Sequence, residues 1–180
     1  MARNFLRWPV LLALLAGCAY TPVKPAHNEA PVDQRLPLRL AVDMNPQQLA
    51  QKTLYIYYYQ EIYYPEGQFV RDAALTAFAP LVKQVLPREE MPAPDFIIKV
   101  SGKSVFNPLM RVFYADVTAT GYLPSGEEIG TFNASSEVGG VVSSYERAFG
   151  KAYVAAFQEI GRKFLQSGAL SAAASQHTTD

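Results

Sequence analysis

The sequence predicts an α+β domain, a two-layer sandwich in which two helices pack on one face of a largely antiparallel sheet of about four to five strands. Several segments are apolar at every second position or throughout, which is typical of strands. Two others repeat apolar residues at spacings of three and four, which places them on one face of a helix. Because each helix must bury its apolar face, stacking both helices on one sheet face is the simplest arrangement.

The first half of the domain is predicted to contain two strands and a helix. Residues Leu36–Val42 place apolar side chains at alternate positions, which indicates a strand. Residues Thr53–Tyr59 are mostly β-branched or aromatic, which indicates a second strand. A turn at Pro65–Gly67 then leads into a helix whose apolar stripe runs from Phe69 to Val85 and which ends at Pro87.

The second half is predicted to contain three strands and a helix. Residues Phe96–Val100 are almost wholly apolar, so we expect a central strand. Two long strands, Met110–Tyr122 and Glu128–Val138, flank Pro124–Gly126, a composition that favours a hairpin turn. The last helix, over 143–164, begins with Ser and Glu at capping-box spacing.

Residues 1–17 have the features of a secretory signal peptide. Arg3 and Arg7 precede a short apolar run, and small residues then lead to Cys18, the only cysteine of the chain. The run is shorter than the roughly 20 apolar residues that span a bilayer. Leu15–Cys18 resembles the lipobox of bacterial lipoproteins, which implies cleavage before Cys18, lipidation of its sulfur and acylation of the new amine. The alternative is an ordinary signal peptide followed by an incidental cysteine.

The segments around the domain suggest how the chain is placed in the cell. In the lipoproteins that this chain resembles, an Asp after the lipidated cysteine commonly retains the protein in the inner membrane. Ala19 therefore favours the outer membrane of a Gram-negative host, with the domain on the periplasmic side. Residues 18–35 contain three prolines and form a predicted tether, which extends to roughly 50 Å at ~3.1 Å per residue. The domain is predicted over 36–166, and the Ala/Ser-rich tail over 167–180 is predicted to be disordered.

Composition and motifs argue against several classes of function. Removal of Arg3 and Arg7 from the 16 basic residues leaves 14 against 16 acidic residues, without a basic patch that would indicate nucleic-acid binding. The two histidines, His27 and His177, lie in the predicted tails, and no phosphate-binding glycine motif is present. Asp116 is expected on the solvent face of its strand, and the alternative is a catalytic or ligand-binding acid. We therefore expect no catalytic residues, no metal site and no cofactor.

A cluster of tyrosines is the strongest indication of a binding surface. Six of the eleven tyrosines lie within residues 55–64. On a strand, Tyr55, Tyr57 and Tyr59 point to one side while Leu54, Ile56 and Tyr58 point to the other. An exposed row of phenols suits stacking on sugars or anchoring of a protein partner. Alternatively, tyrosine simply favours strands and the row is covered by the following loop. The candidate binding residues are Tyr55, Tyr57, Tyr59, Tyr63 and Tyr64.

The order helix, three-strand meander, helix behind a lipobox is similar to that of small outer-membrane lipoproteins. Examples are the LptE-type lipopolysaccharide-assembly proteins, the YajG family and the CsgG-like secretion proteins. The resemblance covers about Thr53–Leu165 and rests on topology, without a diagnostic motif. Together with the missing catalytic groups, it predicts a non-enzymatic outer-membrane lipoprotein that is an accessory or assembly subunit of an envelope transport, secretion or surface-polymer complex. Its partner would be an envelope protein or further copies of the chain. The alternative is a module that binds glycan, peptidoglycan or lipid through the tyrosines.

Overall fold

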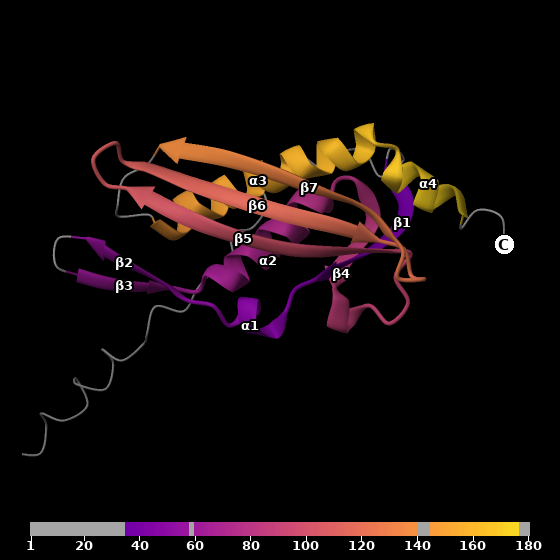
Figure 1. Cartoon of the computed structure of the whole chain (residues 1–180), viewed down its shortest axis with the longest axis horizontal. Coiled ribbons are helices and arrows are strands. Elements are labelled where there is room, and N and C mark those ends of the chain that lie inside the picture. Colours follow the sequence, from indigo (N-terminus) through magenta and orange to yellow (C-terminus); the bar gives the residue numbers. More distant parts are fainter. Residues whose placement is uncertain (1–34, 58–59, 140–144, 177–180) are drawn as a thin grey trace, which may run out of the picture.

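The computed structural model describes residues 35–57, 60–139 and 145–176, so Cys18 and the predicted tether lie outside the described residues. The described residues form one five-stranded sheet, one separate two-stranded hairpin, two long helices that lie on one face of the large sheet, and shorter helices around them (Figure 1). In chain order, the elements are β1 (Leu36–Asp43), α1 (Pro46–Leu49), β2 (Thr53–Tyr57), β3 (Gln60–Tyr64), α2 (Glu66–Phe78), β4 (Val82–Pro87), the 3₁₀ helix η3 (Arg88–Glu90), β5 (Phe96–Asn107), β6 (Val112–Tyr122), β7 (Glu128–Gly139), α3 (Tyr145–Gln166) and α4 (Ala169–Gln176). The predicted α+β sandwich class is confirmed.

The large sheet has the strand order β4-β1-β5-β6-β7. The strands β4, β1 and β5 run parallel to one another, with Leu40 opposite both Val85 and Phe96. The strands β5, β6 and β7 form the expected antiparallel meander, in which Ser104 lies opposite Ala115. Because side chains alternate along a strand, every second residue of β5 faces the helices and the others face outward.

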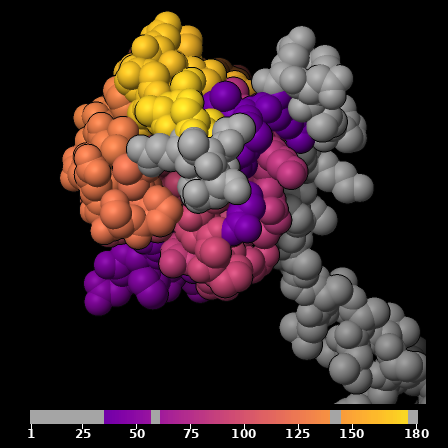
Figure 2. Space-filling model, turned by 90° about the vertical axis from the view of Figure 1, so that its right-hand side faces the viewer, coloured from indigo at the N-terminus to yellow at the C-terminus, as the bar shows by residue number. Residues whose placement is uncertain are grey.

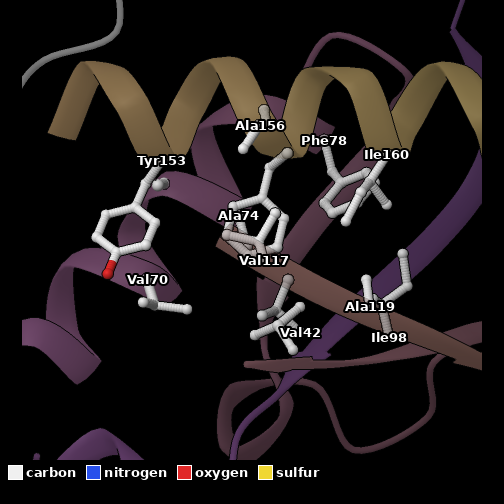
Figure 3. Packing of buried hydrophobic residues seen from close by; sticks show 14 of the residues in the cluster. Val42, Val70, Ala74, Phe78, Ile98, Val117, Ala119, Tyr153, Ala156 and Ile160 are labelled. Carbon is white, nitrogen blue, oxygen red and sulfur yellow. The ribbon is translucent and has the colours of Figure 1, made fainter. Parts of the chain in front are cut away.

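The core lies between this sheet and the two long helices. Figure 3 shows Tyr153, Ala156 and Ile160 of α3 pointing toward the sheet, where Val117 and Ala119 of β6 lie. All five side chains are buried. The single apolar face of α3 therefore packs against the sheet as its sequence pattern predicts.

Close packing requires a glycine at one point of the sheet. A Cβ atom on Gly121 would lie 2.6 Å from the ring of Phe96 and 2.8 Å from that of Phe164. These two rings meet edge to face, with their centroids 6.0 Å apart. Gly121 thus lets α3 approach β5 and β6 closely.

The helix predicted to run to Val85 is shorter in the structure. The helix α2 ends at Phe78, and the following residues form β4, which pairs with β1. Pro80 explains the difference, because proline has no backbone N–H and its ring clashes with the preceding helical turn. Val82 and Val85 continue the helical spacing of apolar residues in the sequence. In the structure, they lie in β4, a strand at the edge of the sheet.

The predicted strand over 53–59 does not join the large sheet. Its described part is β2, which pairs only with β3. A two-stranded hairpin is marginally stable by itself, so this one depends on packing against the rest of the domain.

The prediction of a disordered tail is wrong for Ala169–Gln176, which form α4. Gly168 adopts a left-handed φ of 75° after α3, a conformation in which a residue without a Cβ is not strained. Leu170 and Ala173 are buried, and α4 contacts β1 and α3. Figure 2 shows α4 in yellow covering one end of the domain beside β1 in indigo. Residues 177–180 lie outside the described residues.

We expect Leu170→Ala to lower the free energy of unfolding by roughly 2–5 kcal/mol, because it removes a fully buried side chain from the contact between α4 and the core. Urea denaturation followed by circular dichroism measures the change. Ser171→Ala, at an exposed position of the same helix, is the matched control and should be nearly neutral. Equal stability of the Leu170→Ala variant and the wild type would contradict the proposed contribution of α4.

Candidate functional site

The β2–β3 hairpin lies at the end of the domain where β5 turns back into β6 (Figure 1). Leu54 pairs with Tyr63, and Tyr55 pairs with Ile62. Because neighbouring residues point to opposite faces, Tyr55, Ile62 and Tyr64 share the inner face of the hairpin. Among the described residues, the outer face carries three large exposed apolar side chains, which we term the hairpin surface: Leu54, Ile56 and Tyr63.

Two of the candidate binding tyrosines face the core. Tyr64 is buried and stacks on Phe69, with the ring centroids 4.3 Å apart. Tyr55 is half-buried, and its ring centroid lies 4.9 Å from that of Phe149 in α3. The expectation that Tyr55 belongs to an outward row is therefore wrong, because the ring fills the space beside α3. Tyr59 and the side chain of Tyr57 lie outside the described residues.

The outer face of the hairpin is more aliphatic than expected. Ile56 is 70% exposed and Tyr63 is 63% exposed, while Leu54 beside them is also exposed. The Tyr63 hydroxyl donates a long hydrogen bond of 3.5 Å to Glu61 on the same face. Among the described residues, the outer face of the hairpin thus presents two exposed aliphatic side chains and the exposed phenol of Tyr63.

A buried carboxylate fixes the inner side of the hairpin. Glu66, the first residue of α2, is only 2% exposed. Its Oε1 accepts hydrogen bonds from the Ser104 backbone N–H at 2.6 Å, the Ser104 hydroxyl at 2.7 Å and the Tyr153 hydroxyl at 2.7 Å. Its Oε2 accepts hydrogen bonds from Gln51 Nε2 at 3.1 Å and from the Thr53 hydroxyl. Glu66 therefore joins α2 to β2, β5 and α3.

At Ser104, side chains take the place of a neighbouring strand. The pairing of β1 with β5 extends only to Lys99. Further along β5, the Ser104 N–H donates to Glu66, and the Ser104 carbonyl accepts from the Tyr55 hydroxyl at 3.0 Å. The Tyr55 hydroxyl also lies 2.7 Å from the Ser104 hydroxyl. The hairpin is thus attached to the edge of β5 through Tyr55 and Glu66.

This environment disfavours ionisation of both buried phenols. Burial raises the pKa of Tyr55 to about 12; the negative charge of Glu66 adds to this rise, and the hydrogen bond with Ser104 opposes it. Burial, followed by the charge of Glu66, also raises the pKa of Tyr153 well above its usual range. Among the described residues, no lysine or arginine forms an ion pair with Glu66. Both phenols consequently remain neutral donors at physiological pH.

Sequence reasoning missed Glu66, because the segment Pro65–Gly67 was interpreted only as a turn. Its neighbour Gly67 packs closely against α1, because a Cβ atom there would lie 2.6 Å from the carbonyl oxygen of Leu49. Three of the five hydrogen bonds to Glu66, however, come from Ser104 and Tyr153, which lie 38 and 87 positions further along the chain. Local periodicity does not reveal such contacts.

The remaining predicted positions agree with the expected solvent face or lie outside the structure. Asp116 is exposed on the outer sheet face, accepts a hydrogen bond from the Ser135 hydroxyl at 2.6 Å and lies 3.8 Å from Lys103 Nζ. Cys18, the predicted lipidation site, lies outside the described residues. Within the ranges that the structure covers, there is no cluster of three or more potential metal ligands. The helices in those ranges are too short or too polar to cross a bilayer.

Comparison with known proteins gives similarity of fold but no family. No family model matches the sequence, and a comparison with curated proteins gives no match. A crystal structure of an uncharacterized protein is similar, with a TM-score of 0.50 and 12% identity over 72% of this chain and 95% of that chain. A Caulobacter crescentus CB15 protein described as a "putative lipoprotein" has a TM-score of 0.36 and 16% identity over 62% and 82% of the two chains. The first similarity supports the fold alone, and the second is too weak to support an inference.

We expect ionisation of Tyr55 to leave the free energy of unfolding unchanged below pH 10 and to lower it between pH 10 and 12. The folded-state pKa of Tyr55 is raised from its ordinary value of 10.0 to about 12, so the unfolded chain loses this proton first. Urea denaturation at a series of pH values measures the effect, and absorbance of tyrosinate reports the ionisation directly.

Tyr55→Phe is the matched variant for this measurement. Loss of the hydroxyl should lower stability near neutral pH by about 1 kcal/mol and reduce the alkaline fall. The fall should not vanish, because Tyr153 also has a raised pKa. An identical alkaline fall in the wild type and in Tyr55→Phe would contradict the assignment to Tyr55.

Proposed function

We propose that this protein is a lipid-anchored, non-enzymatic protein of the bacterial outer membrane whose periplasmic domain docks an envelope protein through the hairpin surface. The lipobox resemblance at Leu15–Cys18 supports the anchor, and Ala19 supports the outer membrane. The observation that carries the docking role is the contrast between the two sides of the hairpin. Its outer side exposes Leu54, Ile56 and Tyr63, while its inner side is fixed to the domain.

The composition of the hairpin surface suits a protein partner. Leu54 and Tyr63 are directly paired, and Ile56 lies two residues further along on the same face. Their side chains therefore form one continuous apolar patch, and exposed patches of this kind mark interaction sites. An accessible aromatic residue among aliphatic neighbours is a common anchor of protein interfaces.

The rigidity of the hairpin also supports docking. The stacking of Tyr64 on Phe69 and the hydrogen bonds of Tyr55 to Ser104 hold the hairpin in one position. A surface that is already ordered loses less conformational entropy when a partner binds. The hairpin can therefore recognise a partner without first folding on it.

The hydrogen bonds of the buried carboxylate of Glu66 support a non-catalytic role. Both oxygens of Glu66 accept hydrogen bonds from groups of the protein itself. The carboxylate thus stabilises the fold and is not directed at a ligand. Within an envelope complex for transport, secretion or surface-polymer assembly, such a domain would position its partner.

A second candidate function is binding of glycan, peptidoglycan or lipid. The exposed ring of Tyr63 favours it, because a flat phenol with a polar tip stacks well on a sugar. Burial of Tyr64 and the inward position of Tyr55 leave fewer exposed phenols for stacking than the sequence suggests. Docking of a protein is therefore the better supported function.

We expect Ile56→Ser and Tyr63→Ser to reduce co-purification of an envelope partner at least tenfold while changing stability little. Both side chains are largely exposed, so the variants lose contact with the partner more than core packing. The measurement is quantitative mass spectrometry after purification from detergent-solubilised envelopes. Thr131→Ala, on the polar outer face of the sheet, is the control and should retain the partner. A partner that remains bound to both serine variants would exclude this surface, and a monomer that binds a glycan array would favour the second candidate.

We expect Cys18→Ser to abolish lipidation, leaving an uncleaved precursor or a protein released from membranes. Intact mass spectrometry and membrane fractionation at high salt measure this outcome. Ala19→Asp should keep the lipid and move the protein toward the inner membrane. Unchanged outer-membrane fractionation of Cys18→Ser would show that the lipid is not the anchor, and unchanged sorting of Ala19→Asp would remove the basis for the assigned membrane.

A further inference from the structure

The turn between β5 and β6 exposes two large apolar side chains at the same end of the domain as the hairpin (Figure 1). Leu109 is 94% exposed and Met110 is 66% exposed. Arg111 follows directly, and the segment from Ser104 to Ala115 contains no acidic residue. An exposed apolar tip beside a cation is thus part of the folded domain.

The tip is held in a fixed conformation. Asn107 Oδ1 accepts hydrogen bonds from the backbone N–H groups of Leu109 at 3.1 Å and Met110 at 3.2 Å. Pro108 fixes its own φ angle, and Arg111 has a φ of 54°, which is uncommon for a residue other than glycine. These features fix the backbone of the turn, from which both apolar side chains extend into solvent.

An aromatic cluster supports the base of the turn. The rings of Phe106 and Phe113, on either side of it, stack with their centroids 4.5 Å apart. Tyr145, at the start of α3, meets both rings edge to face, at centroid distances of 5.2 Å and 5.4 Å. The tip thus stands on packed rings and is not part of a loose loop.

We infer that Leu109 and Met110 insert into the surface of the lipid bilayer that holds Cys18, with Arg111 beside the phosphates of the lipid headgroups. This inference rests on the proposed function, because it takes the lipid anchor as given. Apolar side chains flanked by a cation are the composition of segments that lie in a membrane interface. The positive charge of Arg111 complements anionic headgroups. Tyr63 on the neighbouring hairpin suits the same interfacial depth.

The predicted tether is long enough for the lipid and the tip to reach one bilayer. Because β1 runs parallel to β5 and Leu40 lies opposite Phe96, the start of β1 lies about 50 Å from the turn at ~3.3 Å per residue. The tether over 18–35 spans a similar distance, roughly 50 Å when extended. The lipid and the tip can therefore contact the same bilayer when the tether is almost fully extended.

Such an orientation would give the hairpin surface its place in the envelope. The turn and the hairpin lie at the same end of the domain (Figure 1). Insertion of the tip would therefore hold Leu54, Ile56 and Tyr63 close to the plane of the membrane. A partner embedded in the outer membrane would meet the hairpin surface there.

A single tryptophan tests the inference. Trp8, the only tryptophan of the chain, lies in the predicted signal peptide, so the mature protein has none. Leu109→Trp then gives a fluorophore at the tip. Lys83→Trp, at an exposed position near the start of β4, gives the matched control away from the tip. Each lipidated protein is reconstituted into vesicles of phosphatidylethanolamine and phosphatidylglycerol, with and without brominated acyl chains.

We expect the Leu109→Trp emission to shift to the blue in vesicles and the brominated chains to quench it at least twofold, while the control changes little. Adding Arg111→Gln should weaken this quenching in vesicles that contain phosphatidylglycerol. Equal emission and equal quenching at both positions would overturn the inference. A tip that becomes shielded only when a co-purified envelope protein is added would overturn it in favour of a protein pocket.

Intact mass separates this inference from the proposed function. A lipidated protein whose tip is not quenched overturns the insertion alone and leaves the anchor established. A protein that carries no lipid overturns the anchor. In that case, quenching of the tip on vesicles still supports insertion, and lack of quenching overturns insertion as well.

Discussion

The hydrogen bonds of Glu66 are the constraint on which this fold depends most. Transfer of a carboxylate from water into a protein core is costly unless hydrogen bonds or opposite charges replace its hydration. Here neutral donors from the segment before β2, from β2 itself, from β5 and from α3 surround the two oxygens. Loss of one donor leaves the buried carboxylate of Glu66 with fewer hydrogen bonds and therefore destabilises it. The four segments are therefore coupled, and the hairpin keeps its position only while all of them are in place.

The same kind of contact protects the edges of the sheet. Open strand edges invite pairing with other chains, so proteins block them with charged side chains or covering segments. Tyr55 and Glu66 form hydrogen bonds with the backbone of Ser104, in the part of β5 that does not pair with β1. At the opposite edge, Lys163 of α3 donates to the carbonyl of Asn133 in β7 at 2.6 Å. Side chains from the hairpin and from the helices thus bind backbone groups with which another strand could otherwise pair.

The sequence predicted the parts of the fold that local patterns determine. Alternation in β6 and the apolar stripe of α3 indicated both elements, because each buries one regular face. Alternation in β2 could not show which face of the strand is buried. Tyr55 faces inward because its ring packs on Phe149, which lies far along the chain. The sequence of α4 was difficult to distinguish from a disordered tail, because its alanines form only a weak apolar face. Leu170 is nevertheless fully buried. The role of Glu66 depends on Ser104 and Tyr153, and local periodicity carries no information about such distant partners.

The position of β1 has a consequence for the history of the chain. Among the described elements, β1 comes first along the chain, yet it lies between β4 and β5 and contacts α4, the last of them. Its contacts are therefore complete only when β4, β5 and α4 are available. Contacts between distant parts of a sequence slow folding. If residues 1–17 act as the predicted signal peptide, this delay would keep the polypeptide unfolded during export.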